Sequence, residues 1–300
     1  MESAHPALDR PSSLERLAAY KELSKPNLTH LVVVTAVFGY WLASVRMGWF
    51  DWPRFLFTIV GTWLTSAGAC ASNMVIEGEN DRKMRRTQGR PIPSGRVSAG
   101  EAGVVAALLF VTGFLVLALG AGWLPAGLSL ATLVFYAVIY TPLKRRGGLA
   151  IALGAVPGAL PPVIGWSAAQ GSLDWGALIL FVLLFAWQYP HFLALAYIYR
   201  QDYARGGFEF IPLSESERRT GIQMSFGCQL AVLASLFPVL SGLVGPVYAV
   251  GAGLAGGAFC TLGVQAALHL HAKAARAVFL GSIAYLPALL LLTVVDHVLR

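Results

Sequence analysis

The sequence predicts an all-α, polytopic membrane protein with about nine transmembrane helices in a bundle, and three observations carry that prediction. Hydrophobic residues make up 56% of the 300 residues and charged residues only 12%, whereas a soluble domain carries about a quarter charged residues. The apolar residues recur in runs of about 20, the length that crosses a bilayer as a helix. The basic residues gather in alternate connections between these runs, as in membrane proteins of fixed orientation.

Hydropathy divides the chain into nine candidate spans. Residues 1–24 precede them and are polar and mixed in charge, which predicts a cytoplasmic tail rather than a cleaved signal peptide. Residues 25–300 then form a single transmembrane domain. Taken in order, the spans are roughly 28–48, 54–76, 100–120, 122–141, 149–169, 174–199, 222–244, 247–268 and 276–298.

The connections justify this division and set the orientation. With the N-terminus in the cytoplasm, all but three of the 22 Lys and Arg fall on the cytoplasmic side, the exceptions being Arg46, Arg54 and Arg300. Cytoplasmic loops carry such an excess, so we expect the N-terminus inside and the C-terminus outside. The short connections 120–123 and 170–175 then lie on the outer face, where nothing suggests chemistry.

The cytoplasmic loops 77–98, 141–148 and 200–221 also hold most of the acidic residues that lie beyond the N-terminal tail. Orientation alone explains the basic residues of these loops. It does not explain the acids, because Asp and Glu contribute little to the orientation rule. The acids therefore indicate a function at this face.

Asn73, Glu77 and Asp81, called here the acid row, recur every four residues where the second span leaves the membrane. On a helix this spacing places the three side chains on one face, one turn above another. Side chains that carry oxygen are ligands for Mg²⁺, which commonly holds substrate phosphates at the same time. An intramembrane charge is costly unless it has a partner or faces a polar cavity, so the acid row predicts a metal site.

Three arginines follow the acid row within two helical turns: Arg85, Arg86 and Arg90. Guanidinium groups bind diphosphate oxygens in a forked geometry. Acids and bases side by side therefore suit a metal–diphosphate complex, in which carboxylates hold the cation and arginines hold the anion. The alternative, on spacing alone, is a solvated loop with local ion pairs.

A second group of polar residues lies at the end of the fourth span, in YTPLKRRGG. Tyr140 and Lys144 are four residues apart, so a phenol and an ammonium group can point to the same place. Pro142 weakens the case for a regular helix between them. Taken alone, the basic triplet that begins at Lys144 is explained by orientation.

A third group ends the sixth span. His191 lies in an otherwise apolar helix one residue after Pro190, and Asp202 follows it by eleven residues, close to three helical turns. Both side chains can therefore share a face, which Gly206 continues. An intramembrane His aligned with an Asp indicates a functional site rather than a packing residue.

The acid-bearing ends of the second and sixth spans face the same side of the membrane. A helical bundle can bring them together across a central cavity, where Mg²⁺ would hold a diphosphate. Aromatic rings along a lipid-accessible cavity would stabilise a carbocation, although bundle packing is the commoner role of any single ring. The candidate rings are Trp63, Phe135, Tyr136, Trp166, Trp187 and Tyr189.

Together these motifs resemble a known family. The chain resembles the protohaem IX farnesyltransferases (haem O synthases), a family within the UbiA superfamily of intramembrane prenyltransferases. Four segments carry the resemblance: NxxxEGENDxxMxRTxxRPxPSG, YTPLKR, GAxPGAxPPxIGW and PHFxALA…DYxxGG. The resemblance extends from Leu23 to about Pro212. The acid row alone indicates only the superfamily, and its combination with the PHF and DY segments indicates the haem branch.

The resemblance implies nine spans around a central cavity that opens to the lipid, and it implies roles for individual residues. The implied catalytic residues are Asp81, Asp202 and Lys144. The implied metal ligands are Asn73, Glu77, Asp81 and Asp202. The implied substrate-binding residues are Asn73, Arg85, Arg86, Arg90, Tyr140, His191 and Tyr203. His191 stands where other superfamily members carry an acid, and we expect it beside the haem.

The implied reaction transfers a farnesyl group from farnesyl diphosphate to a vinyl group of haem B, giving haem O and diphosphate. The implied cofactor is Mg²⁺, which with cationic side chains neutralises the departing diphosphate; haem B is a substrate rather than a permanent cofactor. We expect the lipid bilayer and a downstream haem A synthase as partners, and no nucleic acid. We also expect a bacterial inner-membrane protein with its active site at the cytoplasmic face.

Two alternatives stay open. Another enzyme of the superfamily would prenylate an aromatic or quinone-precursor acceptor, and the PHF…DY arrangement argues against it. An anion transporter would predict polar residues that continue to the outer face, whereas the outer ends of the spans are apolar.

Overall fold

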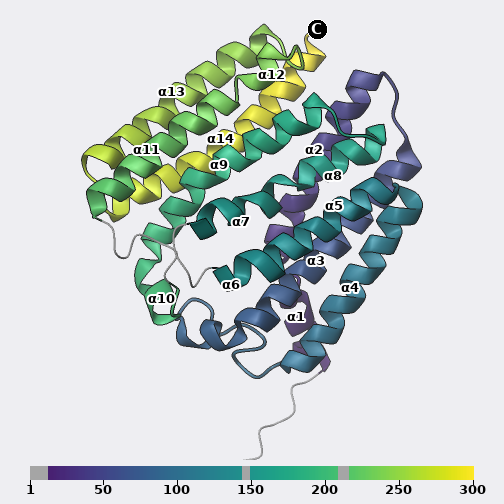
Figure 1. The fold of residues 1–300 in the computed structure, drawn as a ribbon, viewed down its shortest axis with the longest axis vertical. Coiled ribbons are helices and arrows are strands. Elements are labelled where there is room, and N and C mark those ends of the chain that lie inside the picture. The colour runs from purple at the N-terminus through teal and green to yellow at the C-terminus, as the bar shows by residue number, and fades with distance from the viewer. Residues whose placement is uncertain (1–12, 144–148, 209–215) are drawn as a thin grey trace, which may run out of the picture.

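The computed structural model describes residues 13–143, 149–208 and 216–300, and these residues are mostly helical with no strand among them (Figure 1). Nine helical segments in this part of the chain are long and apolar enough to cross a bilayer. The predicted fold class and the predicted number of spans are therefore confirmed. The protein is an integral, multi-pass membrane protein.

A short polar helix precedes the spans, and several spans consist of more than one helical segment. In chain order the elements are α1 (Ser13–Leu23), α2 (Pro26–Met47), α3 (Trp52–Lys83), α4 (Ala99–Gly120), α5 (Trp123–Leu133), η1 (Val134–Tyr140), α6 (Thr141–Leu143), α7 (Leu149–Ala159), α8 (Pro161–Gln170), α9 (Trp175–Ile198), α10 (Arg200–Arg205), α11 (Glu217–Ala234), α12 (Phe237–Leu240), α13 (Pro246–Leu268) and α14 (Ala272–Val298).

The second span, α3, is longer than the sequence predicts. The Asp51 carboxylate accepts the amide N–H of Arg54 at 3.0 Å and so caps the start of the helix. The helix then continues to Lys83, beyond the predicted end of the span at residue 76. The whole acid row therefore lies on one uninterrupted helix, which fixes the relative positions of its three side chains.

Small residues let the spans approach closely. A Cβ atom added at Gly39 of α2 would overlap the carbonyl oxygen of Pro162 in α8, and one added at Gly165 of α8 would overlap the carbonyl oxygen of Ala36 in α2. A Cβ atom added at Gly68 of α3 would lie 2.7 Å from the backbone nitrogen of Phe110 in α4, a less extreme but still forbidden contact. Helices in lipid associate by such van der Waals contact, because the lipid tails are as apolar as the side chains. Glycine at these positions is a requirement of packing.

Two spans in the middle of the bundle are irregular. The fourth changes from α-helix to π-helix over Val134–Tyr140 and returns to α-helix at Thr141. The fifth is interrupted at Leu160, between Pro157 and Pro161. Proline removes a backbone donor from a helix, and π-helical turns are frequent at functional sites. Residues of both irregular spans line the central cavity.

The helices form two packed groups, one on each side of the irregular spans (Figure 1). In one group α9, α11, α13 and α14 share a hydrophobic core that includes Met224, Tyr248 and Phe259. In the other group α2, α4 and α8 share a core that includes Tyr40 and Trp166. This division leaves α7 and η1 between two packed groups of helices.

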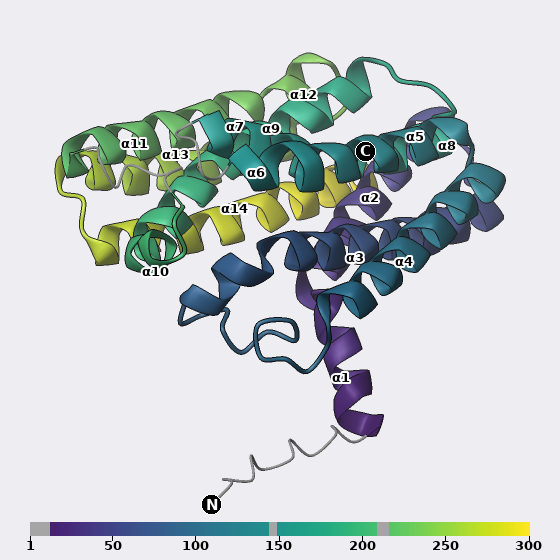
Figure 2. The same ribbon diagram turned by 60° about the horizontal axis from the view of Figure 1, so that its bottom comes forward.

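The first helix, α1, extends from the bundle on the same side as the loop that joins α3 to α4 (Figure 2). Arg16 and Tyr20 both donate to the Glu101 carboxylate at the start of α4. Arg96 in the loop donates to Glu22 at 2.7 Å. The segment that the sequence marks as a polar tail thus includes a helix attached to the bundle, and its cytoplasmic location stays a prediction.

Candidate functional site

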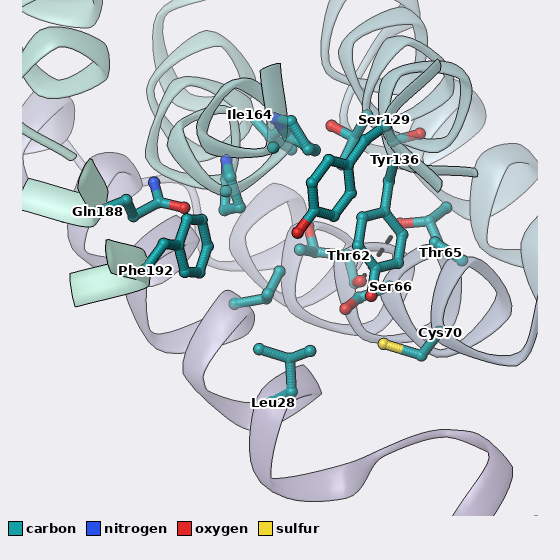
Figure 3. A pocket seen from close by; sticks show the side chains of 18 residues that line it. Leu28, Thr62, Thr65, Ser66, Cys70, Ser129, Tyr136, Ile164, Gln188 and Phe192 are labelled. Carbon is teal, nitrogen blue, oxygen red and sulfur yellow. Dashed lines mark hydrogen bonds between the residues drawn. The ribbon is translucent and has the colours of Figure 1, made fainter. Parts of the chain in front are cut away.

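A cavity of about 230 Å³ lies where the irregular fourth and fifth spans meet α2, α3 and α9. Figure 3 shows Gln188 and Phe192 of α9 on one side of this cavity, with Ser66 and Cys70 of α3 on the other. The walls are mainly apolar, with a few hydroxyl groups. Such a cavity fits an apolar ligand that has a polar end.

Two tyrosines of the π-helix form one wall of the cavity. The rings of Tyr136 and Tyr140 stack with centroids 6.0 Å apart. A Cβ atom at Gly154 of α7 would overlap the Tyr140 ring, so α7 and η1 are in direct contact. Of the candidate rings from the sequence, Tyr136 therefore lines the cavity, whereas Trp166 is fully buried in the core between α2 and α8.

Asn73, the first residue of the acid row, lies one helical turn beyond the cavity-lining Cys70, toward the α3–α4 loop. It is buried, and its side-chain oxygen accepts from the Lys25 ammonium at 2.7 Å. Its nitrogen donates to the Thr141 hydroxyl at 3.2 Å. Lys25 has a left-handed backbone conformation with φ of 44°, which is uncommon for a residue with a long side chain. Lys25 therefore places a cation beside Asn73, and it was not among the residues that the sequence predicted for the site.

Of the predicted pair Tyr140 and Lys144, the structure describes only Tyr140. Tyr140 lines the cavity, and Thr141 beside it donates its hydroxyl hydrogen to the Tyr136 carbonyl at 2.7 Å. Lys144 lies outside the described residues. Its predicted catalytic role, and its predicted alignment with Tyr140, therefore stay predictions.

Asp81, the last residue of the acid row, is completely buried. One of its carboxylate oxygens accepts from the Arg90 guanidinium at 2.6 Å. The other oxygen has no hydrogen-bond partner among the described residues. Glu77, one turn before Asp81, is also buried. The acid row therefore runs inside the protein from the cavity toward the loop, and a lone buried carboxylate oxygen is costly to keep.

The loop between α3 and α4 is packed against the bundle. Met84, Thr87, Ile92 and Val97 are all buried. The Thr87 hydroxyl donates to the Asp81 carbonyl at 2.9 Å, which folds the loop back onto the end of α3. The loop is therefore packed rather than fully solvated, although it does contain local ion pairs such as Arg90–Asp81.

Asp202 lies next to the same loop. Its carboxylate accepts the backbone N–H of Arg85 at 3.2 Å and that of Arg86 at 3.1 Å. It also accepts from the Arg205 guanidinium at 3.2 Å. Figure 1 shows α10 beside the segment that follows α3. The structure thus brings the two acid-bearing ends together, with Asp202 bonded to the backbone after α3.

Arg86 and Tyr203, both candidate substrate-binding residues, lie together. The Arg86 guanidinium is 5.2 Å from the ring centroid of Tyr199 and 5.9 Å from that of Tyr203. Attraction between a cation and an aromatic face orients the guanidinium. The Asp202 bond to the Arg86 amide holds the backbone of the same residue, so both ends of Arg86 are positioned by α10 and the turn before it.

A polar hollow of about 370 Å³ lies beside α10 and is lined by Arg85, Arg200, Arg205 and Asp202. The hydrogen bond from Arg200 to Glu217, at 3.1 Å, raises the pKa of the Arg200 guanidinium. The lining of this hollow has three arginines and one aspartate, so positive side chains outnumber negative ones there. The arginines of this hollow, together with Arg90, make the loop end of the acid row a suitable place for a diphosphate.

His191 does not share a face with Asp202. Helix α9 ends at Ile198, and Asp202 belongs to the separate helix α10. His191 points instead toward α14, where its Nδ1 lies 2.8 Å from the Ser282 hydroxyl oxygen and its ring stacks 4.8 Å from Phe279. The predicted alignment fails because the break after Ile198 turns the chain.

Asn80 joins two helices at the site and was not among the sequence candidates. Its nitrogen donates to the Gly206 carbonyl at 2.6 Å, which links α3 to the end of α10. Asn80 follows Asn73 by seven residues and Glu77 by three. A search at spacings of three and seven, as well as four, would have placed it on the face of the acid row.

The donor atoms of the acid row fit a hard divalent cation such as Mg²⁺. Asp81 supplies a buried carboxylate oxygen with no protein partner among the described residues, and Glu77 lies one turn away. Within those residues no three His, Cys, Asp or Glu side chains already form a metal cluster. A cation at the row would therefore need further oxygens from a substrate or water, as Mg²⁺ commonly does.

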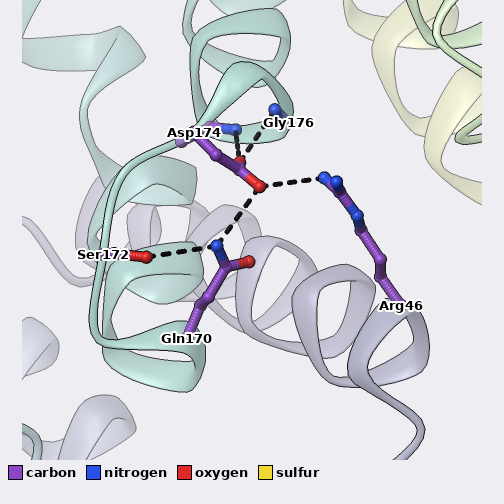
Figure 4. A network of polar contacts seen from close by, with 6 residues as sticks. Arg46, Gln170, Ser172, Asp174 and Gly176 are labelled. Atoms are coloured by element: carbon purple, nitrogen blue, oxygen red, sulfur yellow. Dashed lines mark hydrogen bonds and ion pairs between the residues drawn. The ribbon is translucent and has the colours of Figure 1, made fainter.

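A different polar network joins the helices at the predicted outer face (Figure 4). Asp174 caps α9 by accepting the Gly176 N–H at 2.9 Å. The same carboxylate accepts from Arg46 of α2 at 2.9 Å and from Gln170 of α8 at 3.2 Å. This network ties α2, α8 and α9 together.

Comparison with known proteins places the chain in a family. It matches the UbiA prenyltransferase family over residues 32–289. The protoheme IX farnesyltransferase of Solibacter usitatus is 40% identical over 288 residues, which cover 93% of this chain and 98% of that protein. The protoheme IX farnesyltransferase of Anaeromyxobacter dehalogenans is 39% identical over 282 residues, which cover 93% of this chain and 94% of that protein.

Solved structures share the fold at low identity. A structure of digeranylgeranylglyceryl phosphate synthase has a TM-score of 0.79 and 17% identity, covering 95% of this chain and 100% of its own. A UbiA homolog from Archaeoglobus fulgidus, solved with GPP and Mg²⁺, has a TM-score of 0.60 and 11% identity, covering 92% of this chain and 99% of its own. The family match spans most of the chain and the relatives align end to end. The chain is therefore a prenyltransferase of the UbiA family and belongs, within it, to the protoheme IX farnesyltransferases.

Proposed function

We propose that this enzyme transfers a farnesyl group from farnesyl diphosphate to a vinyl group of haem B, releasing diphosphate and forming haem O. One observation carries the proposal: the buried acid row leads from an apolar cavity to an arginine-rich loop. An isoprenoid diphosphate has the same polarity, with an apolar chain at one end and an anion at the other. The names of the relatives support haem as the acceptor.

The cavity would hold the farnesyl chain, and its tyrosines would act on the reacting carbon. When the allylic C–O bond breaks, positive charge develops on the farnesyl group. The faces of Tyr136 and Tyr140 along the cavity stabilise such charge by cation–π attraction. The apolar walls also keep water from the allylic cation until the vinyl group attacks it.

The basic residues around the acid row would bind the diphosphate. Arg90 already lies against Asp81, so a guanidinium and a carboxylate meet at one place. Lys25 reaches Asn73 at the other end of the row. We assign Arg85, Arg86 and Lys144 to the same anion, with Lys144 assigned from the sequence alone. These donors neutralise the negative charge that the leaving diphosphate gains.

We assign Glu77 and Asp81 as the carboxylates that hold a divalent cation, with Asn73 and Asp202 as further ligands. When bound, Mg²⁺ supplies Lewis-acid stabilisation of the diphosphate oxygens. The Archaeoglobus fulgidus homolog binds GPP together with Mg²⁺, which supports the same pairing of prenyl diphosphate and metal here. Each carboxylate oxygen has two lone pairs, so Asp202 can accept the amides of Arg85 and Arg86 and still offer an oxygen to the metal.

The acceptor step needs an electron-rich carbon and then water. The vinyl group of haem B attacks the allylic cation and forms the new C–C bond. Water adds to the resulting cation beside the porphyrin, and loss of a proton completes a hydroxyethylfarnesyl group. We place this chemistry at the cytoplasmic face of a bacterial inner membrane, with support from the basic loops and the bacterial relatives. A haem A synthase would be the consumer of the product.

A competition between acceptors tests the proposal. The purified protein in lipid vesicles is given farnesyl diphosphate and Mg²⁺ with either haem B or a hydroxylated aromatic acid, and the products are separated and identified by mass spectrometry. We expect haem O and no prenylated aromatic acid. Prenylation of the aromatic acid without haem O would overturn haem as the acceptor while keeping the enzyme class.

A further inference from the structure

A second hollow, of about 780 Å³, opens on the side of the bundle between α2, α9 and α14 and is called here the α2–α14 groove. Aromatic rings line it from all three helices: Trp41 from α2, Trp187 from α9 and Phe279 from α14. Its edges are exposed apolar side chains, among them Val34 and Leu291. The groove therefore faces lipid, and among the described lining residues His191 is the one that can titrate or bind a metal.

Hydrogen bonds fix the tautomer of His191. The Ser282 hydroxyl donates its hydrogen to the Phe279 carbonyl at 2.6 Å. A hydroxyl has only one hydrogen to donate, so in its 2.8 Å contact with His191 Nδ1 the Ser282 oxygen is the acceptor. Nδ1 therefore carries the ring hydrogen, and the lone pair of the neutral imidazole lies on Nε2.

The ring of His191 is also held in place. It stacks on Trp187 with centroids 5.1 Å apart and on Phe279 at 4.8 Å. The Trp187 indole N–H donates to the Ser282 carbonyl at 2.7 Å, which fixes α9 against α14. A histidine that binds a metal almost always donates its other ring N–H to such a partner, which fixes the tautomer and the ring orientation.

We propose that the α2–α14 groove holds the haem acceptor, with Nε2 of His191 as an axial ligand of its iron and Ser282 as a positioning residue. This inference rests on the proposed function, because haem B is the acceptor there. The aromatic side chains among the lining residues give a macrocycle large apolar contact areas, and the hollow is of the size that holds a ligand of several rings. Imidazole is a common ligand of haem iron.

The groove and the central cavity are neighbours along α9. Gln188 and Phe192 line the cavity, while Trp187 and His191, each one residue earlier, line the groove. A macrocycle ligated by His191 therefore lies beside the cavity that would hold the farnesyl chain. Its edge faces the seam between α2 and α9, and through this seam a vinyl group would meet the allylic carbon.

Positive charge at one end of the groove suits the negatively charged propionate groups of haem. Arg276 is exposed on α14, one helical turn before Phe279. Ala272, at the start of the same helix, borders the arginine-lined hollow. Haem carries two propionate carboxylates, and guanidinium groups bind carboxylates well. We therefore place the propionates toward Arg276.

Haem binding to the purified full-length protein tests this inference without relying on turnover. Ferric haem is titrated into the protein in detergent, and the Soret band and the electron paramagnetic resonance spectrum report a histidine ligand. We expect the histidine signature to disappear in His191→Ala and to return when imidazole is added, which also shows that the variant is folded. Ser282→Ala should keep the ligand but bind haem about 10-fold more weakly, because the ring loses its orienting partner.

Two controls separate ligation from general binding. His297 stacks on Trp41 at 5.4 Å and places its Nδ1 2.8 Å from the Thr293 carbonyl, so it is a histidine of the same tautomer near the far end of the groove. His297→Ala should leave the histidine signature unchanged. Metal-free protoporphyrin IX should bind the wild-type protein and His191→Ala equally, because it has no iron to ligate.

The outcomes distinguish this inference from the proposed function. A histidine signature that persists in His191→Ala, or that disappears in His297→Ala instead, overturns the inference even if haem O is formed. Ligation that depends on His191, in a protein that makes no haem O under any condition, supports the site and overturns the proposed function.

Discussion

At the scale of single residues, Asp81 is a buried charge that needs an explanation. It is completely buried, with one oxygen paired to Arg90 at 2.6 Å and the other without a partner among the described residues. Replacing a buried ion pair by apolar residues is often neutral or stabilising, so stability alone gives no reason for this charge. A role in holding a cation would explain why the charge is there.

Asp81→Asn tests that role. The amide keeps the shape of the side chain but removes its negative charge, so we expect prenyl transfer to fall by at least about 100-fold, the range seen when one electrostatic catalytic contact is lost. Diphosphate release measured with both substrates present follows the reaction. Membrane fractionation shows whether the variant still inserts.

Glu79→Gln is the matched control. Glu79 lies two residues away on the same helix, but its side chain is 83% exposed and forms only a long ion pair, of 3.9 Å, with Arg82. We expect near wild-type turnover in this variant. If Asp81→Asn were as active as Glu79→Gln, Asp81 would have no part in the metal site.

At the scale of elements, α10 acts as a clamp on the loop between α3 and α4. Asp202 accepts two backbone N–H groups of that loop, and Asn80 of α3 donates to the Gly206 carbonyl after α10. These bonds join segments more than a hundred residues apart in sequence. The loop carries the arginines assigned to the diphosphate, so the clamp positions the anion site.

Asp202→Ala should loosen this loop. Hydrogen bonds to a charged group contribute roughly 1.5–3 kcal/mol each, so we expect hydrogen exchange at the Arg85 and Arg86 amides to rise by tenfold or more. Arg205→Ala removes only the guanidinium contact of Asp202, at 3.2 Å, and should leave both amides protected. Unchanged exchange in Asp202→Ala would show that the clamp does not hold the loop.

Close helix contact leads to a second prediction at this scale. Gly39→Ala places a methyl group on the Pro162 carbonyl, so α2 and α8 must move apart, at a cost of about 1–3 kcal/mol for overpacking. Gly127→Ala, in α5, meets nothing within 4 Å and should be neutral or gain up to about 1 kcal/mol from helix propensity. Thermal denaturation in detergent compares the two, and equal melting temperatures would refute the close contact.

The elements also show how far the sequence could predict this structure. Nine apolar runs gave nine spans, because crossing a bilayer requires apolar length. The extension of α3 to Lys83 was missed, because its last turns are polar and hydropathy detects solubility in lipid rather than helicity. The π-helical turns over Val134–Tyr140 lie in a uniformly apolar run, where no change of composition marks them.

The candidate site also has features that the sequence could predict and features that it could not. Periodicity placed the acid row on one face of a helix, because only local geometry is needed. The partners of Asp202 are amides 116 and 117 residues away, which no local pattern contains. Lys25 and Ser282 were missed for the same reason, since their roles depend on contacts with other helices.

At the scale of the whole molecule, the described part of the chain crosses the bilayer nine times. Figure 1 shows the C-terminus at the opposite end of the bundle from α1. The basic loops predict that the α1 end is cytoplasmic. The acid row, the arginine-lined hollow and α10 all lie at the α1 end, so the active site would draw farnesyl diphosphate from the cytoplasm.

Cysteine labelling tests this orientation. Cys70 and Cys228 are buried and Cys260 is half-buried, which keeps background labelling low. A membrane-impermeant maleimide should label Ser172→Cys in intact cells, and it should label Gln88→Cys only after the membrane is opened, since both positions are exposed and lie at opposite ends of the bundle. The reverse pattern would invert the topology and move the site to the outer face.

The central claim is that this prenyltransferase uses haem B as its acceptor. The most direct measurement is made in a bacterial host that has lost its own haem-farnesylating enzyme, by extracting the haems after expression of this chain and identifying them by chromatography and mass spectrometry. The account predicts haem O in cells that express the wild-type chain and haem B alone in cells that express Asp81→Asn. Haem B alone in cells whose membranes contain the folded wild-type protein would contradict it.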